Sequence, residues 1–482
     1  MPDNNRKAAI RPPDDVLKNA MQGYMRENSG NGLSIDQQLL RLQREFGINP
    51  SRASFLRKRA SLKIQTVRMN NNIRESEADM AQAVIDLKAS DPQGRWGVEN
   101  VKQRLANSDV YLSRNDIRTS MHDYFDDEFN ERAPGGRNKP TNRTPLVSAG
   151  PGESEHFDGH EKTGQLALNL GPNIGLPLYG CKDKYSAFIR AMTVLPNVRK
   201  EHVIAHWYLD LTEAYDYNIP ITLVTDKGSE VGLMGKIHAA LRLEAAPEYT
   251  VEDFPPHVQI PSTHNTPIES VWRWQREGEG HNLREVIEAG VEAGRFVPGS
   301  ALHADVFNWL LPPLVQDRLD AFQDYWNLHK ISKQRNKLMP SGMSPSHLMA
   351  VPESGNPVAR HCWIKVNPES VQRWREELGG TEGRDEVMSF VSDEFHAEAD
   401  EAWIGVGSPQ VTLSNVWDVC TLVVEQIQAR RSMLLDNNML RLVLPNNGFE
   451  SVSTRAHLRF TCIPATLPVI VKAKILNNSI AT

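Results

Sequence analysis

LPLYGCKDKYSAFIRAMTVLP, residues 176–196, is typical of two β-strands joined by a turn at Lys182-Asp183-Lys184. A shorter segment before it, EHFDGHEK at residues 155–162, has the character of a further strand. The sequence therefore predicts three consecutive strands, of which the last two form a hairpin.

Alternating helices and strands follow the hairpin. Apolar side chains recur at helical spacing over residues 199–217, and ITLVT at 221–225 is an apolar run typical of a strand buried within a sheet. A helix around 229–243, a strand at 257–261 and a helix containing Glu269 complete the series. This α/β order, with three strands first, predicts a ribonuclease-H-like core, a mixed five-stranded sheet flanked by helices.

Three acidic residues stand at the ends of these elements. Asp158 ends the first strand, Asp226 follows ITLVT, and Glu269 lies in the first turn of its helix. Each has an ordinary alternative role, because Asp is common in turns and Thr266-Pro267-Ile268-Glu269 matches a helix capping box. We interpret the three acidic residues as one functional site because all three stand at the end of a predicted strand or the start of a predicted helix.

Carboxylates converging from rigid elements are typical of sites that bind divalent cations. Mg²⁺ prefers hard oxygen ligands and retains several waters, so a few carboxylates suffice to bind it. Two such ions can activate the attacking oxygen and stabilise the leaving oxygen in phosphodiester chemistry. The sequence thus favours Asp158, Asp226 and Glu269 as ligands of two Mg²⁺ or Mn²⁺ ions, with no small-molecule cofactor.

The motifs HFDGHEK, TDKGSE and HNTPIESVWR together resemble those of the DDE integrase/transposase catalytic core, the retroviral-type integrase superfamily. The likeness is greatest to integrase-core proteins of fungal mobile elements. It implies that Asp158, Asp226 and Glu269 are catalytic metal ligands in DNA 3′-end processing and strand transfer. It also implies a homo-oligomer that binds element ends and target DNA. The alternative is a catalytically inactive, domesticated DNA-binding or chromatin protein that retains the fold.

Residues 31–74 have the pattern of a helix-turn-helix. Ser34 opens one helix, Gly47 ends it, and Ser51 starts a second, basic helix in a stretch without acidic residues. The predicted DNA contacts in and just after the second helix are Arg57, Lys58, Arg59 and Lys63. An ordinary helical hairpin with a solvated basic face is the alternative.

Amino-acid composition and the spacing of apolar residues divide the rest of the chain into predicted regions. We predict a flexible arm at 1–30, a second helical, helix-turn-helix-like domain at 75–131, a basic linker at 132–152, the catalytic core at 153–350, and a C-terminal region of unknown role at 351–482. The linker could follow a DNA backbone or act as a plain tether.

Other residues near Glu269 have predicted supporting roles. Arg273 and Arg276 lie at i+4 and i+7 from Glu269, so they share its helix face and could contact DNA or form a solvated stripe. Trp272 and Trp274 are expected to pack at the core and its rim. The histidines beside Asp158 are expected to be structural rather than ligands.

Composition excludes several classes of protein. The net charge of −6 shows no basic excess over the whole chain, and four scattered cysteines form no disulfide framework. The first residues are polar, unlike a secretory signal, and no apolar run is long enough to span a membrane. We therefore expect a soluble, intracellular protein, nuclear if the source is eukaryotic.

Overall fold

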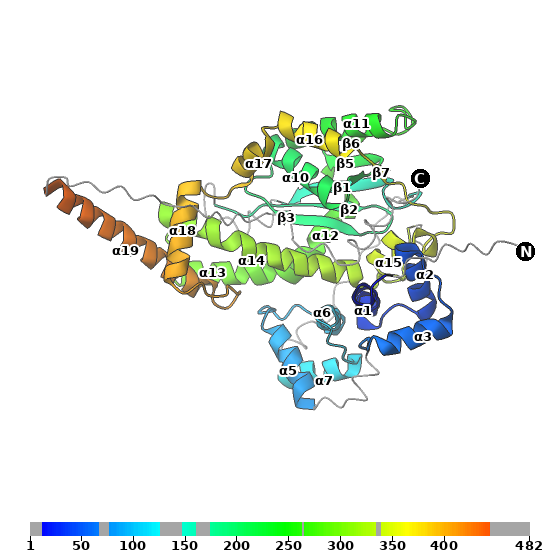
Figure 1. Ribbon diagram of the computed structural model, residues 1–482. Helices are drawn as coiled ribbons and strands as arrows, with labels where there is room; N and C mark the ends of the chain where they lie inside the picture. The colour runs from blue at the N-terminus through cyan, green and yellow to red at the C-terminus, as the bar shows by residue number, and fades with distance from the viewer. Residues whose placement is uncertain are drawn as a thin grey trace, which may run out of the picture.

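A five-stranded mixed sheet lies at the centre of the structure, a computed structural model that describes residues 12–66, 77–125, 147–160, 174–262, 265–333 and 339–443 (Figure 1). The strands in spatial order are β3 (Ile189–Val194), β2 (Leu178–Asp183), β1 (Ser154–His160), β5 (Thr222–Asp226) and β6 (His257–Ile260). β1, β2 and β3 are antiparallel neighbours, whereas β5 and β6 run parallel to β1. The predicted ribonuclease-H-like sheet is confirmed.

The hairpin turn comes later than the sequence predicts. β2 continues through Lys182 and Asp183, both buried, and the turn lies between Asp183 and Ile189. The Asp183 carboxylate accepts hydrogen bonds from the Ser186 amide at 2.7 Å and hydroxyl at 2.6 Å. This side-chain bonding closes the turn, because Asp can mimic a backbone turn acceptor.

Helices cover both faces of the sheet. α10 (Glu201–Ala214) and α11 (Gly232–Ala245) pack on one face around Phe157 and Leu223. The opposite face carries α12 (Thr266–Gln275), α13 (His281–Glu292) and the long α14 (Ala301–Leu328). Successive residues of a strand point to opposite faces, so Asp158 lies on the α12 side while Phe157 lies on the α10 side.

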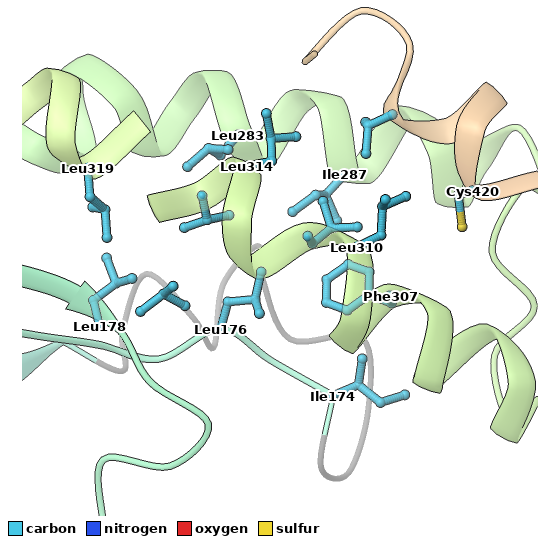
Figure 2. Packing of buried hydrophobic residues seen from close by; sticks show 14 of the residues in the cluster. Ile174, Leu176, Leu178, Leu283, Ile287, Phe307, Leu310, Leu314, Leu319 and Cys420 are labelled. Atoms are coloured by element: carbon cyan, nitrogen blue, oxygen red, sulfur yellow. The ribbon is translucent and has the colours of Figure 1, made fainter. Parts of the chain in front are cut away.

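The core on the α12 side extends well beyond the sheet (Figure 2). Its labelled residues are Ile174, Leu176 and Leu178 in and before β2, Phe307, Leu310, Leu314 and Leu319 of α14, Leu283 and Ile287 of α13, and Cys420. Cys420 belongs to α19 (Val416–Val443), so the C-terminal region completes this core rather than standing apart from it.

The N-terminal helices begin with α1 (Asp14–Gly30), which corrects the prediction of a flexible arm from residue 14 onward. Leu17, Met21 and Tyr24 of α1 are buried, and α1 packs against α6 (Val98–Asn107). The arm prediction failed because Leu42 and Phe55 of the next two helices, together with α6, bury one side of this polar helix. Residues 1–11 lie outside the described residues.

The two helices predicted between residues 31 and 74 are present. α2 (Ile35–Phe46) starts with a capping box formed by Ser34 and Gln37 and ends at Gly47, whose φ is 67°. α3 (Arg52–Ser61) starts at Ser51, whose side chain accepts from the Ser54 amide. The caps are confirmed, because they depend on contacts only three residues away.

Three further helices follow, α5 (Glu77–Lys88), α6 and α7 (Arg114–Tyr124). Their own apolar core includes Val84, Trp96 and Ile117. This unit is not isolated, because Arg26 of α1 pairs with Asp109 at 2.6 Å across the predicted domain boundary. Most of the predicted linker, up to residue 146, lies outside the described residues.

The C-terminal region wraps around the core. β7 (Ile364–Lys365) pairs with β4 (Asn218–Ile219), and α16 (Pro368–Glu377) and α17 (Gly380–Met388) pack on α10. α18 (Asp393–Gly405) and α19 pack on α14, and the far end of α19 projects away from the body (Figure 1). Among the described residues, no helix has the length and apolarity needed to cross a membrane.

Candidate active site

The two predicted aspartates come from neighbouring parallel strands. β1 and β5 pair in the register His156 to Val224, which places Asp158 and Asp226 side by side at the same end of the sheet. Carboxyl ends of parallel strands share one sheet edge, so this arrangement follows directly from the topology. Glu269 comes from α12, which contacts β1.

The three acids influence one another electrostatically. Burial, together with the negative charges of Asp226 and Glu269, raises the pKa of Asp158 to about 8. A hydrogen bond from Trp272 acts in the opposite direction. The three side chains predicted from sequence are therefore close enough to share one electrostatic environment.

Asn265 joins two of the three elements that form the site. It is the N-cap residue of α12, yet its side chain makes no capping bond. Instead, Nδ2 donates to Asp226 Oδ1 and to the Phe157 carbonyl, both at 3.0 Å, and Oδ1 lies 2.7 Å from His156 Nδ1. The alternative role of Glu269 in a capping box with Thr266 does not hold, because α12 begins at Thr266 and its N-cap residue is Asn265.

His156 is held by this network as a neutral ring. Burial lowers its pKa to about 4, and a neutral imidazole can donate to the Asn265 oxygen. His160 stacks on Trp272 with ring centroids 4.9 Å apart and an interplanar angle of 7°. Both contacts agree with the structural roles that the sequence suggested for these histidines.

Strand β2 holds α12 against the sheet. The buried Lys182 ammonium donates to the Pro267 carbonyl at 2.8 Å and to the Ser270 hydroxyl at 3.2 Å. Gly180, the register partner of Asp158, leaves space for Trp272, because a Cβ at Gly180 would lie 3.1 Å from the indole Cη2. The absence of a side chain at Gly180 thus allows the helix to approach.

Trp272 contributes a polar contact in addition to packing. Its indole Nε1 donates to Asp158 Oδ2 at 2.9 Å, and the residue is buried. Trp272 follows Glu269 by three residues, which places both on one face of α12. The sequence predicted the packing of Trp272 but not this bond, because its acceptor lies far away in the chain on β1.

The donor set suits Mg²⁺ or Mn²⁺, although the carboxylates do not form a closed cage. Among the described residues, no three His, Cys, Asp or Glu side chains form a ready-made metal-binding cluster. The fit rests on chemistry, because three carboxylate side chains are the hard oxygen donors that these ions take. The mutual repulsion that raises the pKa of Asp158 is what a bound dication relieves.

A buried ion network fixes the helix that carries Glu269 to the N-terminal helices. α12 runs into a π-helical turn, η3 (Arg276–Gly280), where Glu279 is buried. Glu279 accepts hydrogen bonds from Arg104 of α6 and from Arg318 of α14, the latter at 2.9 Å from Nε. The Trp96 ring lies 3.9 Å from the Arg104 guanidinium.

The predicted DNA contacts lie at two separate places. Arg273 and Arg276 are exposed on α12 and η3, and Arg273 is 3.6 Å from Glu277. In the N-terminal region, Arg57 and Lys63 are exposed, while Lys58 pairs with Asp14 at 2.6 Å and Arg59 is half-buried. α3 buries only Phe55 among its described residues, so most of its surface is accessible. DNA contact at these residues remains a prediction.

Comparison with known proteins agrees with this geometry. The sequence of residues 149–351 matches the family described as integrase core domain. This segment is a retroviral-type integrase catalytic core. The integrase core family consists generally of polynucleotidyl transferases that bind nucleic acid and typically use divalent metals. No curated protein matches the chain.

The matched segment of the integrase core contains the sheet, α12, α14 and all three acids. Sequence reasoning missed three supporting residues, Asn265, Lys182 and the polar role of Trp272. Asn265 and Trp272 lie in the HNTPIESVWR motif beside Glu269, and this position indicated that they could belong to the site. Nothing in the sequence indicated a role for Lys182 in the site, because a lysine next to a turn is ordinarily exposed.

Proposed function

We propose that this protein catalyses metal-dependent DNA 3′-end processing and strand transfer. The observation that carries the proposal is that the β1–β5 register brings Asp158 and Asp226 to neighbouring strand ends, beside the helix α12 that bears Glu269. The charges of Asp226 and Glu269, which raise the pKa of Asp158, support it. The family match of residues 149–351 supports the same chemistry. Acting on two DNA ends requires two active sites, so we also propose a homo-oligomer, and a nuclear location if the source is eukaryotic.

In this mechanism the three acids would hold two divalent ions, which activate the attacking oxygen and stabilise the leaving oxygen. Asn265 holds Asp226, and Trp272 holds Asp158, so each aspartate keeps its orientation as substrate enters. Water first cleaves a phosphodiester and leaves a 3′-hydroxyl. That hydroxyl then attacks a target phosphodiester, forming a new P–O bond as the old one breaks.

The exposed arginines near the site would bind the DNA that is cut. Arg273 and Arg276 lie one and two turns beyond Glu269 and face solvent. Arg suits this role because its guanidinium contacts phosphate oxygens in a bidentate manner. α3 would bind DNA further from the site through Arg57, Lys58, Arg59 and Lys63.

A strand-transfer assay tests the proposal. The full chain would be incubated with Mn²⁺ and oligonucleotides ending in the terminal repeats of the host element, and joined products would be measured. We expect joining by the natural protein and a loss of at least about 100-fold in Glu269→Gln, because one charged ligand is removed. Glu277→Gln is the matched control, since Glu277 lies on the following turn and is exposed.

Equal joining by Glu269→Gln and the natural protein would overturn the catalytic assignment. Tight DNA binding without joining, and without Mn²⁺ binding, would instead favour the alternative of an inactive, domesticated DNA-binding protein. Mn²⁺ binding measured by calorimetry on the DNA-free protein separates these outcomes.

A further inference from the structure

The indole of Trp272 is held in one position on the sheet. It is 1% exposed, its ring stacks on His160, and its Cη2 edge lies over Gly180. A ring confined by β1 and β2 in this way has little freedom to turn its N–H elsewhere. Its direction toward Asp158 is therefore set by the packing of the sheet.

The contact made by this N–H is with a carboxylate that the proposed reaction needs. Nε1 donates to Asp158 Oδ2 at 2.9 Å. Hydrogen bonds to an ionised acceptor are stronger than neutral ones. A carboxylate has about four lone-pair sites, and the Gly159 backbone also hydrogen-bonds to Asp158, so these two bonds still leave acceptor sites for other ligands.

We propose that Trp272 is a positioning residue for metal binding, which orients the Asp158 carboxylate through its indole N–H. The inference rests on the proposed function and names a residue for which the comparison assigns no role. Glu269 lies one turn earlier on the same helix, so α12 provides one metal ligand and also orients another. A shift of α12 would therefore disturb Asp158 and Glu269 together.

Trp272→Phe tests this role, because it keeps a buried aromatic ring and removes the N–H. The matched control is Trp274→Phe on the same helix, where the side chain is 49% exposed and the ring lies 5.8 Å from the Arg273 guanidinium. Mn²⁺ affinity would be measured by calorimetry on the full, DNA-free chain, with thermal unfolding recorded for each variant.

We expect Trp272→Phe to weaken Mn²⁺ binding by about 10-fold or more, as losing a bond that orients a metal ligand does. Trp274→Phe should bind as the natural protein does. A lower unfolding temperature with unchanged Mn²⁺ affinity in Trp272→Phe would show that the indole only packs, and would overturn the inference.

The proposed function fails in a different way. If Asp158→Asn and Glu269→Gln both bind Mn²⁺ as tightly as the natural protein, the metal site itself is wrong. If both lose binding while Trp272→Phe keeps it, only the role of Trp272 is wrong. These two results are distinguishable within one set of titrations.

A measurement on the natural protein covers the case in which Trp272→Phe does not fold. Indole ¹⁵N–¹H resonances would be recorded during titration with Mg²⁺, and the Trp272 signal identified by its shift in Asp158→Asn. We expect that signal to move on Mg²⁺ binding and to exchange slowly with solvent. An indole set in which no signal responds to both changes would overturn the inference.

Discussion

Arg104 of α6 donates a hydrogen bond to Glu279 of η3, and both side chains are buried. The bond connects the second helical unit to the helix that carries Glu269. Arg318 of α14 donates to the same carboxylate, and the Trp96 ring packs beside both guanidinium groups. A buried charge is therefore one of the contacts that join the N-terminal helices to the integrase core.

Glu279→Gln should destabilise the protein strongly. The change leaves the buried Arg104 and the partly buried Arg318 without their counter-charge, and removing one partner of a buried pair typically costs about 3–5 kcal/mol. Glu277→Gln, on the same turn, is the control. Its carboxylate is 48% exposed and its contact with Arg273 should contribute no more than about 1 kcal/mol.

Denaturant unfolding of the natural protein and the two variants measures this difference. Similar free energies of unfolding for Glu279→Gln and Glu277→Gln would contradict the buried network.

The pKa of Asp158 should fall in Asp226→Asn. The charge of Asp226 raises that pKa, so removing the charge should bring it down from about 8 in the metal-free protein. Carboxyl ¹³C NMR across a pH titration measures the change. Asp253→Asn, in an exposed loop, should leave the pKa unchanged.

The same shift gives stability a defined pH dependence. The folded-state pKa of Asp158 is above its value in an unfolded chain, about 3.9. At a pH between these two pKa values, Asp158 is protonated in the folded state and ionised in the unfolded state. The free energy of unfolding contributed by Asp158 therefore falls as pH rises from about 4 to about 8. Asp226→Asn should narrow that pH range, because it lowers the folded-state pKa of Asp158. An equal range in both proteins would argue that the acids do not interact.

Asn265→Ala should weaken both the fold and the metal site. It removes the donor to Asp226 and leaves the Phe157 carbonyl and His156 without this partner, at a cost of about 1–3 kcal/mol. Mn²⁺ affinity should also fall, because Asp226 loses its orientation.

Asn367→Ala is the comparison for this change. Asn367 is the N-cap of α16, and its side chain accepts from the Glu369 amide at 3.0 Å. Its removal should cost about 1 kcal/mol of stability and leave Mn²⁺ affinity unchanged. An equal effect of both substitutions on metal affinity would contradict the role of Asn265.

Arg57→Ala and Lys63→Ala should weaken DNA binding without changing the fold. Both side chains are exposed on or just after α3. If each contacts a phosphate, each substitution should reduce the slope of log affinity against log salt by about 1. Lys18→Ala, exposed on the neighbouring α1, is the control. Unchanged slopes would favour an ordinary solvated helical hairpin.

The succession of strands and helices along the chain, and the helix caps, could be predicted because their causes are local. Ser34, Gly47 and Ser51 act within a few residues of their own position, and each begins or ends a helix as expected. Asp158 and Asp226 were brought together by strand order alone.

Contacts between distant segments could not be predicted in the same way. α1 is polar in sequence and is ordered by Asp109 and Tyr111, which lie far along the chain. The bond from Trp272 to Asp158 and the burial of Glu279 likewise depend on the final packing. A single sequence shows such residue types but not their partners.

The π-helical turn at Arg276–Gly280 interrupts an otherwise continuous α-helix that runs from α12 into α13. Each residue advances an α-helix by about 100°, so one residue more or less changes which side every later side chain presents. The π-turn takes up one residue more than an α-turn does, so deleting Gly278 would close the helix into regular α-helix. Leu283 and Ile287 would then still face the hydrophobic core while Glu269 kept its bearing on the sheet, whereas the same deletion within α13 would turn the later residues of α13, Ile287 among them, away from the core.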